Sequence, residues 1–167
     1  EGDTDNGSTY NALQLGYGLW PTCMESYGSN LAIALFEGGA SVSASRIRKH
    51  AKIAFWDTTS QDPNSVVWEE FPDDVISSLK NINGVLKVIS GIDRQFGFRV
   101  STYVGGYSFK EEAYFESGGL PLPGAVIGNA SRLLFGSYMD GTLGEKYGCV
   151  YSLGLQKGSL IQPFNWF

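Results

Sequence analysis

The sequence predicts an all-β protein, an antiparallel Greek-key β-sandwich with at most one or two short helices. Of its 167 residues, 43% are hydrophobic, only 17% are charged and 22 are glycine. Gly, Ser, Tyr, Phe and Val suit tight turns and pleated surfaces, whereas helical proteins of this size are rich in Ala, Leu, Glu and Lys. Short apolar runs at close intervals, separated by Gly-rich turns, are typical of a sandwich or barrel with Greek-key connections.

The length is that of a single domain and is sufficient to bury a sizeable core. Residues 1–12 are polar and rich in Gly, Asn and Asp, so we expect a flexible N-terminal arm there. One β domain is expected over residues 13–167.

The first half of this domain contains four predicted elements. The first ordered element is expected at 13–19. The runs 31–36 and 51–56 are short and apolar and are followed by turn or loop residues, which is typical of buried strands. Another short strand is expected at 66–68.

Residues 71–80 fit two local structures. A short helix is favoured by four apolar residues at helical spacing behind a proline and two acidic residues, namely Val75, Ile76, Leu79 and Ile82. The acidic pair also fits a calcium-binding loop. Both interpretations stay open on the sequence alone.

The second half contains further predicted strands. The turn dipeptide Asn83-Gly84 precedes two strands at 85–89 and 96–103. The dipeptide Gly105-Gly106 ends the second of them. Residues 118–124 are expected to be irregular, and the closing strands are expected at 132–135, 148–155 and 160–167.

The net charge of the chain limits the classes of partner that it can bind. A net charge of −5 and a pI near 4.8 argue against nucleic acid, because phosphate binding needs a basic face. An acidic chain suits cations, sugars or protein surfaces.

No apolar run approaches the ~20 residues of a membrane-spanning helix, so we expect no transmembrane segment. The acidic opening, residues 1–8, is like a trimmed end after a removed leader, so we expect an extracellular or secreted protein.

The two cysteines leave a question open. Cys23 and Cys149 lie far apart in the sequence, and a disulfide between them would close a long loop. Two free buried thiols fit the sequence as well.

Nothing in the sequence predicts catalysis. His50 is the only histidine and has no nucleophile motif near it, so a Ser-His-Asp or Cys-His site is not expected. One histidine and two distant cysteines give no zinc-ligand spacing. The acidic pairs Glu69-Glu70, Asp73-Asp74 and Glu111-Glu112 consist of adjacent residues, which point to opposite faces of a strand and form no acid–base pair.

Residues 31–107 resemble the βγ-crystallin Greek-key domain, most clearly over residues 73–107. Residues 73–78 match the family's calcium signature of two Asn/Asp, two arbitrary residues and Ser/Thr-Ser. Further similarities lie at Gly84, Phe96-Gly97 and Gly105-Gly106-Tyr107, and residues 33–38 are similar to the opening strand of a first key. The resemblance implies two four-stranded Greek keys that pair into a sandwich.

The resemblance also implies a calcium site. Side-chain oxygens would come from Asp73, Asp74 and Ser77, and a backbone carbonyl from Val75. Calcium prefers six to eight oxygen ligands, and one such turn offers several.

The sequence therefore predicts a non-catalytic binding or structural β domain, calcium being its expected cofactor. One alternative is a lectin-like carbohydrate-binding module that uses aromatic side chains beside Gly turns, namely Trp20, Tyr103, Tyr107, Tyr138 and Tyr147. The other is a coat or fibre subunit that self-associates or binds a protein partner. The low charge and the aromatic tail at 163–167 favour such assembly.

Overall fold

The structure is a computed structural model, and it confirms the predicted all-β class with antiparallel sheets in a sandwich-like arrangement. It describes residues 12–15, 18–37, 50–60, 66–73, 75–91, 97–106, 108–121, 123–129, 131–140 and 143–154. Within these residues the regular structure is eleven antiparallel strands and one 3₁₀ turn, η2 (Pro123–Ala125). The predicted arm at residues 1–12 lies outside the described residues except for Ala12, and the predicted strand at 160–167 lies outside them entirely.

The strands form three antiparallel sheets. Sheet A has the order β1 (Leu19–Tyr27), β2 (Asn30–Glu37), β3 (Lys52–Trp56) and β4 (Val67–Glu70). Sheet B has the order β5 (Val75–Ile82), β6 (Val85–Gly91), β7 (Phe98–Gly105) and β8 (Ser108–Phe115). Sheet C has the order β11 (Lys146–Gly154), β10 (Arg132–Asp140) and β9 (Val126–Gly128). Each four-stranded sheet is a meander, because consecutive strands are neighbours.

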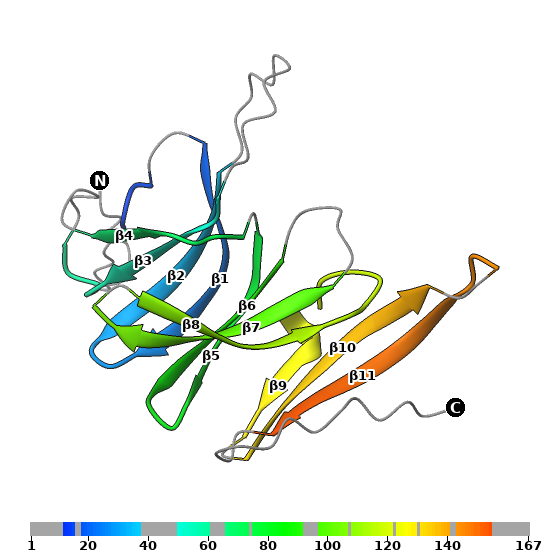
Figure 1. Cartoon of the computed structure of the whole chain (residues 1–167). Coiled ribbons are helices and arrows are strands. Elements are labelled where there is room, and N and C mark those ends of the chain that lie inside the picture. The colour runs from blue at the N-terminus through cyan, green and yellow to red at the C-terminus, as the bar shows by residue number, and fades with distance from the viewer. Residues whose placement is uncertain are drawn as a thin grey trace, which may run out of the picture.

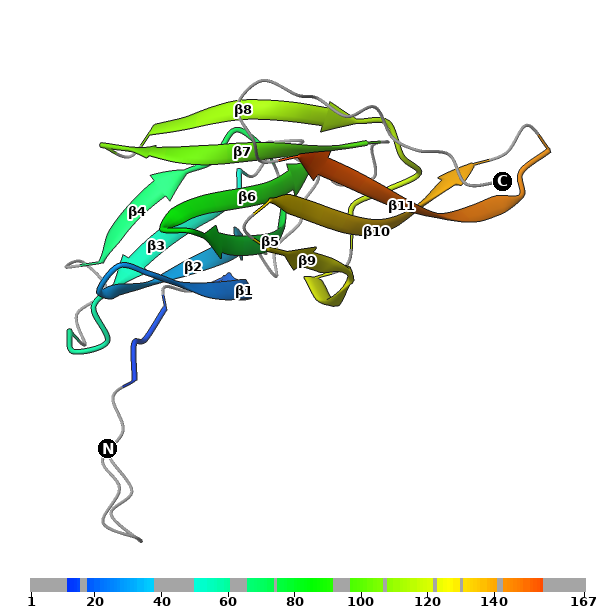
Figure 2. The ribbon, with the colours of Figure 1, turned by 90° about the horizontal axis from the view of Figure 1, so that it is seen from below.

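Sheet B lies between the other two sheets (Figure 1). Successive residues of β6 show this, because Val88 packs toward sheet A and Ile89 packs toward sheet C. Every residue of β6 from Leu86 to Gly91 is buried. Figure 2 shows the four strands of this central sheet side by side. An antiparallel sheet usually has one solvated face, whereas this one carries a core on each side.

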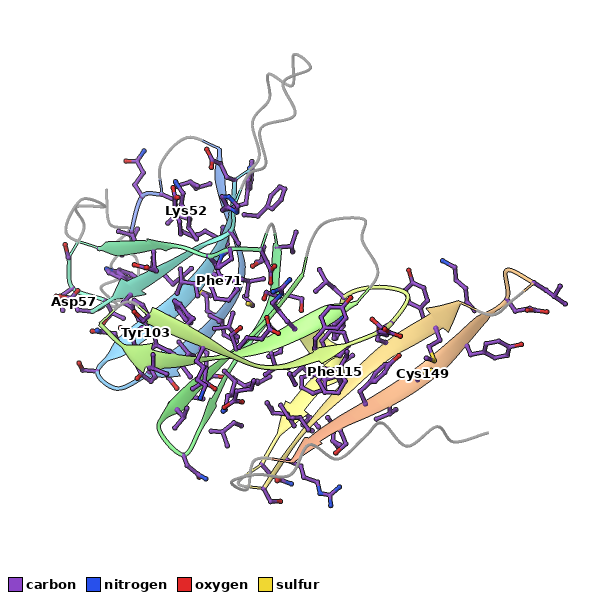
Figure 3. All side chains as sticks on the ribbon, viewed as in Figure 1. Lys52, Asp57, Phe71, Tyr103, Phe115 and Cys149 are labelled. Atoms are coloured by element: carbon purple, nitrogen blue, oxygen red, sulfur yellow. The ribbon has the colours of Figure 1, made fainter. Side chains whose placement is uncertain are left out.

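Two cores hold the three sheets together, and Figure 3 labels one aromatic residue from each, Phe71 and Phe115. The core between sheets A and B, the A–B core, consists of Ala32, Ala34, Ala51, Ile53, Phe71, Ile76, Leu79, Leu86 and Val88. The core between sheets B and C, the B–C core, consists of Ile89, Phe98, Val100, Ala113, Phe115, Val126, Leu133, Phe135, Tyr151 and Leu153. In the B–C core the rings of Phe98 and Phe115 stack with centroids 4.9 Å apart.

The N-terminal residues of the described chain cover the outer face of sheet A. Leu13 and Leu15 pack against Ile33, Leu35 and neighbouring residues on that face, but they join no strand. The expectation of a first element at 13–19 is therefore wrong in its position, because the first strand begins at Leu19. The alternating leucines reflect packing on a sheet rather than membership of one.

Residues 75–82 form a strand, so the helix interpretation is wrong. β5 pairs antiparallel with β6 through the turn Asn83-Gly84, whose φ angles are 52° and 79°. A β-bulge interrupts the register between Ile76 and Ser78. The extra residue brings Ile76 and Leu79 onto the same face although they lie three positions apart. Because of this bulge, the apolar residues of the strand have the three-residue spacing that is typical of a helix.

Other differences from the expected strands lie at charged or exposed segments. Residues 108–115 form β8, which was not predicted, because Lys110, Glu111 and Glu112 interrupt the apolar pattern on this sheet edge. The strands expected at 132–135 and 148–155 form a longer hairpin, β10–β11, which extends beyond sheet B (Figures 1 and 2). In the described part of the chain, no helix is long and apolar enough to cross a membrane.

Candidate functional site

A cleft of about 550 Å³ opens at one end of sheet A. It lies where the β1–β2 turn, the end of β3 and the end of β7 meet. Its described lining consists of Tyr27, Gly28, Ser29, Asn30, Phe55, Trp56, Asp57, Ser60, Val66 and Tyr103. Figure 3 shows Asp57 and Tyr103 at this end of the molecule. The size is within the range of small-ligand sites.

Three aromatic rings from both sheets form one wall of the cleft. Tyr27 ends β1, Phe55 lies in β3 and Tyr103 lies in β7. The centroids of Tyr27 and Tyr103 are 5.6 Å apart in an edge-to-face arrangement, and those of Phe55 and Tyr103 are 5.2 Å apart. All three rings pack against the A–B core. The core therefore fixes this wall before any ligand binds.

A tight loop that follows β3 also lines the cleft, through Trp56, Asp57 and Ser60. The Oδ1 atom of Asp57 accepts hydrogen bonds from the backbone N–H groups of Thr59 and Ser60, each at 2.9 Å. The indole Nε1–H of Trp56 donates to the carbonyl oxygen of Ser60 at 2.6 Å. These bonds hold the carboxylate and the indole on one short segment in fixed orientations.

The loop carries a strained backbone and an anionic group. Thr58 has φ of 67°, a left-handed conformation that β-branched residues rarely adopt. The hydrogen bonds from Ser60 and Thr59 lower the pKa of Asp57 below its ordinary value, so this exposed side chain is a carboxylate at neutral pH.

The lining combines flat apolar rings with hydrogen-bonding groups. Ser29, Asn30 and Ser60 add neutral polar groups to the Asp57 carboxylate. Such a surface suits a ligand with both apolar faces and hydroxyl groups.

Comparison with known proteins adds no family to this description. No family model, curated protein or solved structure matches this chain. The resemblance of residues 31–107 to the βγ-crystallin domain therefore stays a prediction.

Five aromatic residues were predicted to bind a ligand, and of the four that the structure describes only Tyr103 lies in the lining of the cleft. Trp20 is 65% exposed on β1, outside the lining, and Tyr147 is 57% exposed on β11 in sheet C. Tyr107 lies outside the described residues. The structure therefore does not bring the predicted set together.

Tyr138 has structural contacts in sheet C. Its ring packs so closely on Gly118 and Gly119 that a methyl group on Gly118 would overlap the ring. The ammonium of Lys146 lies 4.6 Å from the centroid of the same ring. Gly118 and Gly119, which belong to the segment predicted to be irregular, thus form the surface on which this ring packs.

Sequence reasoning missed most of the cleft. Tyr27, Phe55, Trp56 and Asp57 were not singled out as ligand-binding residues. Two signals were present, since Trp56-Asp57 begins a polar loop after an apolar strand, and Tyr27 precedes a turn containing Gly28. Both signals mark strand ends, but the sequence does not show that the two ends meet.

The residues predicted to bind calcium lie at the start of β5. The carboxylate of Asp73 is buried, accepts a hydrogen bond from Ser90 Oγ at 2.6 Å and pairs with Arg99 Nε at 2.9 Å. Ser77 Oγ donates to the carbonyl oxygen of Ile89 at 3.4 Å, and Val75 begins the strand. Asp74 lies outside the described residues. Calcium at Asp73 would have to compete with the Arg99 guanidinium.

Cys23 and Cys149 are free thiols in different parts of the molecule. Cys23 packs against the A–B core and Cys149 against the B–C core.

His50 pairs its Nδ1 atom with the carbonyl oxygen of Pro72 at 3.0 Å. Among the described residues, no three His, Cys, Asp or Glu side chains are grouped as a metal site would need.

Proposed function

We propose that the chain is a non-catalytic binding domain whose cleft takes a carbohydrate. The observation that carries this proposal is the cleft itself, in which Tyr27, Phe55, Trp56 and Tyr103 lie with Asp57 and neutral polar groups. The apolar faces of sugar rings pack on aromatic side chains, and sugar hydroxyls pair with carboxylate, amide and hydroxyl groups.

A glycan array followed by isothermal titration with the best glycan tests this proposal. The substitution Ser29→Tyr places a ring on the exposed β1–β2 turn at the cleft and should abolish binding. Ser26→Tyr makes the same change on exposed β1, outside the lining, and should leave binding intact. Absence of any glycan binding, or equal binding by both variants, contradicts the proposal.

A second candidate function, an assembly subunit, is favoured by β11, which is an edge strand of sheet C among the strands that the structure describes. β11 is a nine-residue edge strand with an uninterrupted register, no proline and one charged residue, Lys146. In contrast, the edge strand β1 contains Pro21 and a bulge. Long edges without such devices pair readily with further strands. Val150 of β11 is itself exposed and adds an apolar side chain at this edge.

Light scattering over a wide concentration range tests the assembly function. Self-association should weaken in Val150→Lys, because a charge at the centre of β11 opposes strand pairing. Ser131→Lys is a matched control, since it adds the same charge at an exposed turn outside this strand. A strict monomer at every concentration contradicts assembly.

Calcium stabilisation through Asp73, Asp74, Val75 and Ser77 is a separate proposal, supported only by the signature in the sequence. If calcium binds the folded state alone, the melting temperature rises with the calcium concentration, because the stabilisation grows with the logarithm of that concentration above the dissociation constant. An unchanged melting temperature between chelator and millimolar calcium contradicts it.

A further inference from the structure

The charge of the cleft limits the chemical class of ligand that it can bind. Asp57 is the one charged residue among the described lining residues, which include no Lys, Arg or His. The whole chain carries a net charge of −5. An anionic ligand would bring its charge beside a carboxylate without a compensating cation, and such like-charge contacts are unfavourable.

The carboxylate of Asp57 is held in a fixed orientation in which it can pair with a cation. Its Oδ1 atom is held by two backbone N–H groups at 2.9 Å, so its orientation is set by the loop rather than by the ligand. A fixed acceptor loses little conformational freedom when it binds. Those same bonds lower the pKa of Asp57 and keep the group ionised at the mildly acidic pH at which sugar amines are protonated.

The aromatic side chains favour the same charge. Tyr27, Phe55, Trp56 and Tyr103 all line the cleft. The faces of aromatic rings attract ammonium groups, with tyrosine and tryptophan the stronger partners. A ligand that offers both a sugar ring and an ammonium group would therefore use the rings and the carboxylate together.

We propose that the cleft selects a sugar that carries a free, protonated amine over its N-acetylated and acidic counterparts. Asp57 is the specificity-determining residue, because its carboxylate pairs with the ammonium group. This inference rests on the proposed carbohydrate-binding function and adds the chemical class of the sugar.

Isothermal titration with three matched trisaccharides tests the inference. The probes are β-1,4-linked glucosamine, the same trimer fully N-acetylated, and a trimer of a hexuronic acid. The free amine trimer is expected to bind about 2- to 5-fold tighter than the N-acetylated one, since an ion pair with an exposed carboxylate is screened by solvent and adds only modestly to affinity. The acidic trimer is expected to bind weakest.

Two variants separate the charge of Asp57 from other effects. Asp57→Asn keeps an oxygen that accepts the two backbone N–H groups but removes the charge, so the preference for the amine should disappear while the affinity for the N-acetylated trimer stays. Glu145→Gln removes the same charge from an exposed residue next to β11 and should preserve the preference. Circular dichroism shows whether each variant is folded.

The outcomes are distinct. Equal binding of the amine and N-acetylated trimers overturns the amine specificity and leaves the carbohydrate function standing. A preference that survives in Asp57→Asn overturns the role of Asp57. If none of the three trimers binds and the glycan array is also empty, both proposals fall.

Discussion

Thr58 holds a conformation that its own side chain disfavours. Its φ of 67° lies in the left-handed region, which asparagine and glycine adopt far more readily than β-branched residues. The turn between Asp57 and Ser60 imposes this conformation, because the Asp57 carboxylate accepts hydrogen bonds from the backbone N–H groups of Thr59 and Ser60. Strain of this kind is often found at binding sites.

Replacing Thr58 by Asn should therefore stabilise the protein. We expect the free energy of unfolding to rise by about 0.5–1 kcal/mol, as measured by urea unfolding, because the left-handed penalty is reduced. The reciprocal change Asn83→Thr should lower it by a similar amount, since Asn83 has φ of 52° in the β5–β6 turn. A loss of stability in Thr58→Asn would show that the side chain of Thr58 outweighs its backbone strain.

Cys23 should be chemically inert in the folded protein. Burial raises the pKa of its thiol to about 11, so little thiolate is present at pH 8. In a Cys149→Ser variant at pH 8, alkylation by iodoacetamide should be slower by roughly two orders of magnitude than in the urea-unfolded chain. As the pH rises toward the raised pKa, the reaction should accelerate. Rapid alkylation of folded protein at pH 8 would contradict this burial.

At the scale of elements, the strands of sheet B are tied together by ion pairs of unequal weight. Arg99 on β7 pairs with the buried Asp73 before β5 and, at 2.8 Å, with the exposed Glu111 on β8. Breaking a pair that includes a buried charge costs far more than breaking an exposed one.

Two single substitutions at this junction should differ in their effect on stability. Arg99→Gln leaves the Asp73 carboxylate buried without its cation and should lower the free energy of unfolding by about 3 kcal/mol. Glu111→Gln removes only the exposed pair and should cost less than about 1 kcal/mol. Urea unfolding of both variants checks this order, and similar losses would contradict it.

The same elements show what the sequence predicts and what it does not. The apolar runs of β2, β3 and β6 and the turn Asn83-Gly84 have local signals, and these were predicted correctly. β5 was ambiguous because one bulged residue changes an alternating pattern into a helical one. β8 was missed because an edge strand accepts charged residues that hide its alternation.

The cleft depends on contacts between distant segments. Phe55 and Tyr103 lie 48 positions apart in the numbering, yet their rings are 5.2 Å apart. The sequence identified Tyr103 as a candidate because it stands beside a Gly turn. It gave no reason to join Tyr103 to Tyr27 or Asp57, because only the stacking of sheet A on sheet B places them together.

At the scale of the whole molecule, sheet B contributes to both cores. Val88 belongs to the A–B core and Ile89, its neighbour, belongs to the B–C core. The loss of either outer sheet would expose a buried face of sheet B to water. The apolar surface shared in this way couples the three sheets.

The three sheets should therefore unfold together. In a Trp166→Phe variant the remaining tryptophans, Trp20, Trp56 and Trp68, all lie in sheet A. Their fluorescence and the far-ultraviolet dichroism of all sheets should give the same urea midpoint. A second dichroism transition without a fluorescence change would show that strands outside sheet A unfold independently of it.

The burial of β6 on both faces also bears on how this protein tolerates sequence change. A substitution between Leu86 and Gly91 meets a neighbouring layer whichever way the side chain points. Substitutions that preserve folding should therefore be found mainly outside β6, in turns such as Gly28-Ser29 and Asp57 to Ser60. The architecture thus separates the positions that keep the molecule folded from those through which selectivity can diverge.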